Sequence, residues 1–199
     1  MILKVCGITN PEDAAAAIEG GATAIGFNFY QKSPRYIDPG RAATIVSTGV
    51  RRVGVFVNES PARVEAIAAI ARLDVAQLHG EESAADFPEN ITVWKAARVD
   101  DSFEFSAYAN CPAEALLLDG PAGSLYGGSG KTFNWSRVPL VRQKIILAGG
   151  LDASNVATAI ALAHPWGVDA CSSIESAPGK KDHRKMSEFL EAAKAALGA

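Results

Sequence analysis

Eight short apolar runs alternate with amphipathic stretches along the chain, and this alternation restricts the possible folds more than any other feature. The runs show little polar alternation, which is typical of strands buried on both faces of a parallel sheet. They occupy residues 2–6, 24–30, 53–58, 75–79, 92–96, 115–119, 145–149 and 167–172. Helix-start patterns follow several runs, at Asn10-Pro11, Asp38-Pro39, Ser60-Pro61 and either Asp152 or Ser154, and a last helix is expected over 182–197.

The number of strand and helix units predicts an α/β fold. Eight units fit a (β/α)₈ TIM barrel, and we expect residues 1–199 to form a single barrel domain. A doubly wound open sheet is the alternative, which the number of units disfavours. The chain has 199 residues, of which 48% are hydrophobic, and this is enough for one substantial core.

Composition excludes several kinds of partner. The net charge of −3 gives no basic surface for a nucleic acid. The chain shows no signal-peptide pattern and no apolar run long enough for a membrane span. Its three cysteines form no pairing framework, which favours a reducing compartment. We therefore expect a cytoplasmic protein with no nucleic-acid or membrane partner.

Residues 126–133, YGGSGKTF, end like a nucleotide-binding P-loop but do not match that motif. The motif requires a glycine five positions before Gly130, and Leu125 stands there. The motif must also follow a strand directly, whereas about ten residues separate Lys131 from the preceding apolar run. ATP binding is therefore not expected.

Polar residues gather where the predicted strands end, which is where barrels of this kind carry their chemistry. Glycines after the seventh strand and small residues after the eighth favour a phosphate site, with a simple tight turn as the alternative. The strand-end residues are Cys6, Arg35, His79, Lys95, Asp119, Gly149, Gly150, Asp169, Cys171, Ser172 and Ser173.

Cys6 and Asp119 would face each other across the mouth of a barrel, as a general base and a general acid acting on one small substrate require. Each also has a structural interpretation. Free cysteines are often simply buried, and Asp119 could be a capping or supporting acid. A carboxylate that follows four buried residues nevertheless indicates a polar pocket.

Two other strand-end residues have competing interpretations. His79 is either a base or a neutral histidine at the rim of the barrel. Lys95 is either a Schiff-base nucleophile of an aldolase or the partner of a carboxylate. The three histidines and three cysteines lack the spacing of metal ligands, so no metal site is predicted.

Several longer motifs resemble those of the phosphoribosylanthranilate isomerase (TrpF) family, in order and at similar spacing along essentially the whole chain. KVCGIT and the SPR loop carry most of the specificity. The matching segments are KVCGIT (4–9), GFNFYQKSPRYI (26–37), VGVFVN (53–58), QLHG (77–80), LLLD (116–119), GGSGKTFNW (127–135), LAGGL (147–151) and VDACSSIESAPGKKD (168–182).

The resemblance implies a single (β/α)₈ barrel that isomerises N-(5'-phosphoribosyl)anthranilate to 1-(2-carboxyphenylamino)-1-deoxyribulose 5-phosphate. This Amadori rearrangement belongs to tryptophan biosynthesis and uses no cofactor or metal. The resemblance implies that Cys6 is the general base, that Asp119 is the general acid, and that Arg35 holds the anthranilate carboxylate. His79 would line the site, and Gly149, Gly150, Asp169, Ser172 and Ser173 would lie at or beside the phosphate loops.

The resemblance also assigns YGGSGKTF to a mobile loop that covers the site and leads into the sixth helix at Phe133–Asn134. This chain departs from the family pattern at Asn134, Cys171 and Ser173, where Asp, Ser and Gly are common. Three other functions remain as alternatives: an aldolase that uses Lys95, a binding module that has lost its chemistry, and an ATP-dependent transferase. The chain could be a monomer or a homodimer.

Overall fold

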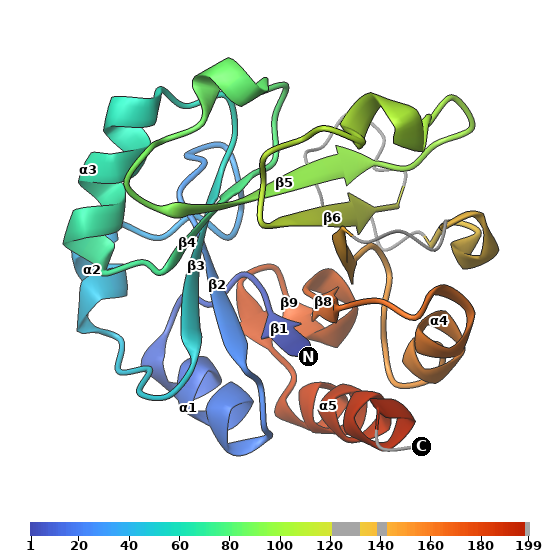
Figure 1. The fold of residues 1–199 in the computed structure, drawn as a ribbon. Helices are drawn as coiled ribbons and strands as arrows, with labels where there is room; N and C mark the ends of the chain where they lie inside the picture. Colours follow the sequence, from blue (N-terminus) through green and yellow to red (C-terminus); the bar gives the residue numbers. More distant parts are fainter. Residues whose placement is uncertain (121–131, 139–142, 198–199) are drawn as a thin grey trace.

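The computed structural model describes residues 1–120, 132–138 and 143–197. Eight parallel strands form a closed barrel in chain order (Figure 1), and β1 pairs with both β2 and β8. This closure confirms the predicted (β/α)₈ barrel and rules out an open sheet. The strands are β1 (Ile2–Val5), β2 (Ala24–Asn28), β3 (Arg51–Phe56), β4 (Val75–Leu78), β5 (Thr92–Arg98), β6 (Ala115–Asp119), β7 (Lys144–Leu147) and β8 (Gly167–Ala170).

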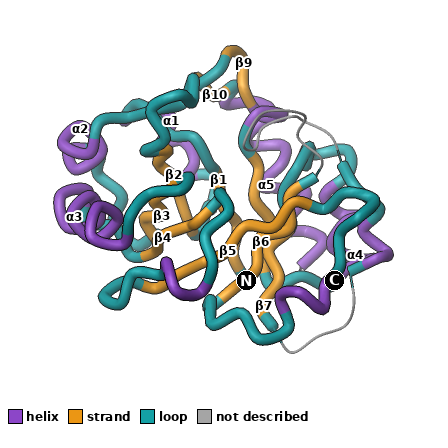
Figure 2. The backbone as a smooth tube through the Cα atoms, turned by 90° about the horizontal axis from the view of Figure 1, so that it is seen from above, coloured by secondary structure: helices purple, strands orange, loops and turns teal. Residues whose placement is uncertain are grey.

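The described residues contain five α-helices, which lie outside the ring of strands (Figure 2): α1 (Pro11–Glu19), α2 (Pro39–Thr44), α3 (Pro61–Ala71), α4 (Val156–Ala163) and α5 (His183–Leu197). The first three begin as predicted, because the side chains of Asn10, Asp38 and Ser60 accept hydrogen bonds from the first turn of each helix.

The prediction for the start of α4 was wrong by a few residues. The N-cap is Asn155, and neither Asp152 nor Ser154 takes that role. The carboxylate of Asp152 instead accepts hydrogen bonds from the backbone and hydroxyl of Ser154, at 2.8 and 2.6 Å. This local turn uses the two capping candidates before the helix begins.

Three connections hold short 3₁₀ helices in their described parts, where the eight strand and helix units predicted helices: η1 (Ala84–Asp86), η2 (Phe105–Tyr108) and η3 (Trp135–Arg137). Pro88 and Pro112 follow the first two closely and prevent their continuation. Asn134 caps the third by accepting a hydrogen bond from the backbone N–H of Ser136. The predicted covering loop falls mostly on residues 121–131, outside the described residues.

The core has two layers, because successive strand residues point to opposite faces of the sheet. One layer lies between the strands and the helices and contains Leu3 and Val5 of β1. The other fills the barrel interior and contains Ile2 of β1, Trp94 of β5 and Leu117 of β6. On β1 the inward positions continue with Lys4 and then Cys6, so polar groups begin midway up the interior.

A two-stranded hairpin follows β8 and leads the chain into α5. It consists of β9 (Glu175–Ala177) and β10 (Lys180–Lys181), and its Glu175 and Lys181 are buried. Among the described helices, none has the length and apolar character needed to cross a membrane.

Candidate active site

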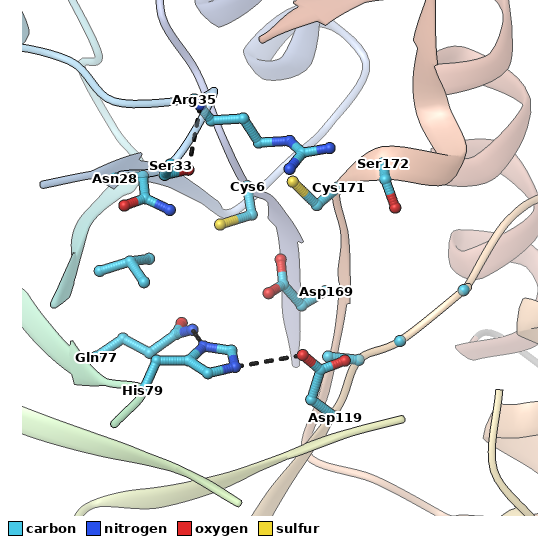
Figure 3. Close-up of a pocket in the computed structure, with 14 residues that line it drawn as sticks. Cys6, Asn28, Ser33, Arg35, Gln77, His79, Asp119, Asp169, Cys171 and Ser172 are labelled. Atoms are coloured by element: carbon cyan, nitrogen blue, oxygen red, sulfur yellow. Dashed lines mark hydrogen bonds and ion pairs between the residues drawn. The ribbon is translucent and has the colours of Figure 1, made fainter. Parts of the chain in front are cut away.

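A pocket opens at the carboxyl ends of the barrel strands (Figure 3), where the barrel fold predicts the chemistry. It gathers most of the site residues that the sequence predicted, although they come from six different parts of the chain. The predicted residues that line it are Cys6, Arg35, His79, Asp119, Gly149, Gly150, Asp169 and Ser172.

Cys6 occupies the position after β1, and its backbone N–H donates to the carbonyl of Ala170 at 2.9 Å. This register brings Cys171 beside it. A hydrogen bond from the thiol of Cys171 lowers the pKa of Cys6 well below its ordinary value, burial opposes the change, and the charge of Lys4 adds to the lowering. The same hydrogen bond raises the pKa of Cys171. Cys6 is therefore the thiol that ionises first, as a base requires.

Asp169 is buried on β8, and its Oδ2 accepts a hydrogen bond from Nζ of Lys4 at 2.8 Å. Its Oδ1 is also buried and has no partner among the described residues. Burial raises the pKa of Asp169 to about 7, although the charge of Lys4 opposes this. Figure 3 draws this carboxyl between Cys6 and Asp119, both of which act on it electrostatically. Asp169 therefore belongs to the centre of the site.

Asp119 ends β6 and is held from two sides. Nε2 of His79 lies 3.3 Å from its Oδ2, and the other ring nitrogen of His79 meets the side-chain amide nitrogen of Gln77 at 3.2 Å. On the opposite side Gly149 leaves no room for a side chain. A Cβ there would lie 2.8 Å from Oδ1 of Asp119 and 2.4 Å from the backbone nitrogen of Gly120. His79 and Gly149 thus fix the orientation of the carboxyl group.

Arg35 reaches the pocket from the loop after β2, and it is paired with Glu175 of the hairpin. Its Nε and Nη2 donate to the carboxylate of Glu175 at 2.8 to 3.1 Å, and Lys181 binds the same carboxylate at 2.9 Å. Nη1 has no hydrogen bond to any described residue, so the edge formed by Nη1 and Nη2 can still face a ligand. Glu175 therefore holds the guanidinium in place over the pocket.

The two predicted serines after β8 differ in their surroundings. Ser172 lines the pocket. Ser173 does not, and its hydroxyl donates to the carbonyl of Leu151. Gly150 does line the pocket, and its carbonyl is held by the side-chain amide of Asn155 at 2.9 Å. The backbone of the loop after β7 is thus tied to the start of α4.

Lys95 is an ion-pair partner in this structure. Its Nζ donates to the carboxylate of Glu82 at 3.0 Å and to the carbonyl of Gly80 at 2.6 Å, and both charged side chains are buried. Lys95 is not among the residues that line the pocket. The structure therefore favours the carboxylate-partner interpretation over that of a Schiff-base nucleophile.

Sequence reasoning missed several residues that shape the site. Gln77 and Lys4 stood within quoted motifs, two positions from His79 and Cys6, and the two-residue period of a strand could have placed them on the inward face. Cys171 was noted only as a departure from the family pattern. No local signal indicated Glu175 or Lys181, because the chain returns to the pocket only through the hairpin. Asn28 and Ser33 also line the pocket.

The fold and site together define a (β/α)₈-barrel enzyme. The mouth of its barrel holds an ionisable thiol, two carboxyl groups and an arginine around one pocket. In the parts of the chain that the structure describes, no three histidine, cysteine, aspartate or glutamate side chains are grouped as metal ligands would be.

Comparison with known proteins places the chain among isomerases of one kind. Residues 3–192 match the family model described as N-(5'-phosphoribosyl)anthranilate (PRA) isomerase. The N-(5'-phosphoribosyl)anthranilate isomerase of Solibacter usitatus is 68% identical over 199 residues, which cover 100% of both chains. A crystal structure of the Thermotoga maritima phosphoribosylanthranilate isomerase superposes with a TM-score of 0.90 at 41% identity, and covers 98% of this chain and 100% of that one.

Another solved structure is a phosphoribosylanthranilate isomerase in complex with reduced 1-(o-carboxyphenylamino)-1-deoxyribulose 5-phosphate. It superposes with a TM-score of 0.87 at 39% identity, and covers 98% of this chain and 100% of that one. The chain belongs to the N-(5'-phosphoribosyl)anthranilate isomerase family. Its activity is the isomerisation of N-(5'-phosphoribosyl)anthranilate in tryptophan biosynthesis.

Proposed function

We propose that this chain carries out the isomerisation with Asp119 as general acid and Cys6 as general base. The single observation that carries this assignment is that both side chains line one pocket, with Cys6 in surroundings that favour its thiolate. A general base and a general acid must both reach the same small substrate.

The first step opens the ribose ring. Asp119, in its protonated form, gives a proton to the ring oxygen, while the aryl nitrogen of the substrate supplies electrons and becomes an iminium. This acidifies the hydrogen on C2', and the thiolate of Cys6 removes it to give an enolamine. Tautomerisation of the enolamine then yields the ketone product. The substrate nitrogen is the electron sink, so the proposed route uses no cofactor.

Binding at the two ends of the substrate is proposed for different residues. Arg35 would hold the anthranilate carboxylate through the guanidinium edge formed by Nη1 and Nη2, because planar pairing of this kind suits a carboxylate. Gly149, Gly150 and Ser172 would surround the phosphate with backbone N–H groups and a hydroxyl. His79 would line the site against Asp119. Support for this arrangement is that all of these residues line the same pocket.

Three broader proposals accompany this one. We propose that residues 1–199 form one domain, because β1 to β8 close a single barrel. We propose a cytoplasmic location, supported by the three free cysteines. A homodimer or a monomer fits the chain, and the Thermotoga maritima enzyme is described as dimeric.

A fluorescence assay with freshly made N-(5'-phosphoribosyl)anthranilate and purified protein tests the catalytic assignment. Wild-type protein should abolish the anthranilate-type fluorescence, and Cys6→Ala and Asp119→Asn should each lose at least roughly 10²-fold in kcat while remaining folded. Cys111→Ala is the matched control, because Cys111 lies outside the residues that line the pocket. Near-wild-type turnover in either site variant would contradict its role, and binding without turnover in wild type would indicate a binding module.

A further inference from the structure

Lys4 is a charged residue in a place where charges are rare. It lies on β1 with its side chain fully buried inside the barrel, two positions before Cys6. Residues two apart on a strand share a face, so Lys4 lies one layer below Cys6. A lysine buried to this degree needs a partner for its charge. The ion pair with Asp169 supplies one.

The position of Gly26 on β2 shows how close Lys4 comes to the sulfur. A Cβ added to Gly26 would lie 2.8 Å from Sγ of Cys6 and 3.1 Å from Nζ of Lys4. The thiol and the ammonium group therefore converge on one point of the inner wall. Only a glycine leaves both in place, so the neighbouring strand is shaped around this contact.

The cluster holds one ammonium group and two acidic groups. Asp169 uses Oδ2 for the ion pair, while its buried Oδ1 has no partner among the described residues. Burial raises the pKa of Asp169 to about 7. Burial alone would lower the pKa of Lys4, but the charges of Asp169 and Cys6 outweigh it and raise that pKa. Lys4 therefore stays charged, and the two acidic groups compete for it.

We propose that Lys4 is the positioning residue that keeps Cys6 in its thiolate form, and that Asp169 limits this effect by sharing the charge of Lys4. The inference rests on the proposed function of Cys6 as the general base. Lys4 lies below the thiol in the barrel interior. It acts on the reaction through Cys6 and not by contact with the substrate.

Other groups act on Cys6 from above and must be separated from Lys4. Cys171 donates a hydrogen bond, and Lys181 of the hairpin contributes a positive charge. Arg35 approaches from the loop after β2 and interacts electrostatically with Cys6. A test must therefore change Lys4 or Asp169 and leave these groups as they are.

The test measures the rate at which iodoacetamide alkylates Cys6 from pH 5 to pH 10, read by mass spectrometry of the Cys6 peptide. Cys111 in the same protein is the internal reference. In Lys4→Met, we expect alkylation of Cys6 at pH 7 to slow by about tenfold or more, because one pKa unit is a tenfold change in the thiolate fraction. In Asp169→Asn, Lys4 is left to Cys6 alone, so alkylation at pH 8, where Asp169 is ionised in wild type, should become several-fold faster.

An unchanged pH profile of Cys6 in a folded Lys4→Met variant would overturn the inference, and so would slower alkylation in Asp169→Asn. If Lys4→Met does not fold, Asp169→Asn decides alone, and an unchanged rate at pH 8 overturns the inference. Turnover gives a separate readout, and Lys4→Met should lower kcat with little change in KM. A shifted alkylation profile with unchanged kcat would support the action of Lys4 on the thiol while contradicting Cys6 as the base.

Discussion

Nε2 of His79 lies 3.3 Å from Oδ2 of Asp119, while Nδ1 of the same ring meets the side-chain nitrogen of Gln77 at 3.2 Å. An amide nitrogen can only donate, so Nδ1 accepts this hydrogen bond and the ring carries its proton on Nε2. Gln77 and His79 stand two positions apart and share the inward face of the barrel. Gln77 thereby selects the tautomer that donates toward Asp119.

Replacement of Gln77 should therefore impair catalysis through its effect on His79. In Gln77→Leu the ring of His79 can carry its proton on Nδ1, and it then no longer donates to Asp119. We expect kcat to fall by roughly tenfold with little change in KM. Steady-state kinetics checks this. Gln143→Leu is the control, because Gln143 lies outside the residues that line the pocket and donates to the carbonyl of Cys111 at 3.5 Å. Equal kcat values in the two variants would remove Gln77 from the support of Asp119.

The contact between Gly149 and Asp119 can be tested against a glycine with the same φ angle. Gly149 and Gly49 both have a φ of 82°, but a Cβ on Gly49 meets nothing within 4 Å. Gly49→Ala should cost only the backbone strain, about 1 kcal/mol of unfolding free energy, and leave kcat unchanged. Gly149→Ala adds the clash with Gly120 and Asp119, so we expect roughly 2–4 kcal/mol and at least a tenfold loss of kcat.

Urea denaturation and steady-state kinetics on both variants separate the two effects. If Gly149→Ala loses no more stability than Gly49→Ala and keeps its kcat, then Gly149 does not hold the carboxyl group of Asp119.

The barrel could be predicted from the sequence because its strands are buried on both faces and read as apolar runs. The N-termini of the helices that begin with a capping residue and then a proline could be predicted equally well. The start of α4 could not, since Asp152 and Ser154 are both good capping residues and a local turn decided between them. Short connections ended by proline also gave 3₁₀ helices where helices were expected.

Candidate site residues could be predicted from the sequence where a reactive side chain stands at the end of a strand, as Cys6 and Asp119 do. They could not be predicted where a site residue is held by a side chain from a distant segment, as Arg35 is held by Glu175. Two adjacent serines after β8 could not be separated either, because a 3₁₀ turn decides which hydroxyl faces the pocket. The strand period would have indicated Lys4 as a neighbour of Cys6.

Arg35 is predicted to act mainly in substrate binding. Its guanidinium binds Glu175 along one edge and leaves a second edge for the substrate, and a lysine cannot do both in a fixed plane. We expect Arg35→Lys to raise KM by roughly tenfold, which corresponds to the loss of one charged hydrogen bond of about 1.5 kcal/mol. The change in kcat should be smaller. A KM equal to that of wild type would remove Arg35 from the site.

Ser172 and Ser173 offer a matched pair for the phosphate end of the pocket. Ser172 lines the pocket, whereas the hydroxyl of Ser173 donates to the carbonyl of Leu151. Ser172→Ala should raise KM severalfold and weaken competitive inhibition by inorganic phosphate. Ser173→Ala should lower the unfolding free energy by about 1 kcal/mol and leave KM near wild type. The reverse pattern would show that Ser173 is the phosphate ligand and Ser172 is not.

Asp169 predicts how the stability of the barrel depends on pH. Its pKa is about 7 in the folded chain and about 4 for an unfolded chain. Between these values the folded chain holds a proton that the unfolded chain has released, so the free energy of unfolding falls as pH rises. Asp169→Asn has no such proton. The stability of the variant minus that of wild type should therefore grow from pH 4 to pH 7, by up to about 1.4 kcal/mol per pH unit, and then level off.

Urea unfolding of both proteins at several pH values measures this difference. A difference that stays constant with pH would mean that Asp169 is already ionised in the folded barrel, and a difference that shrinks would mean that Lys4 lowers its pKa.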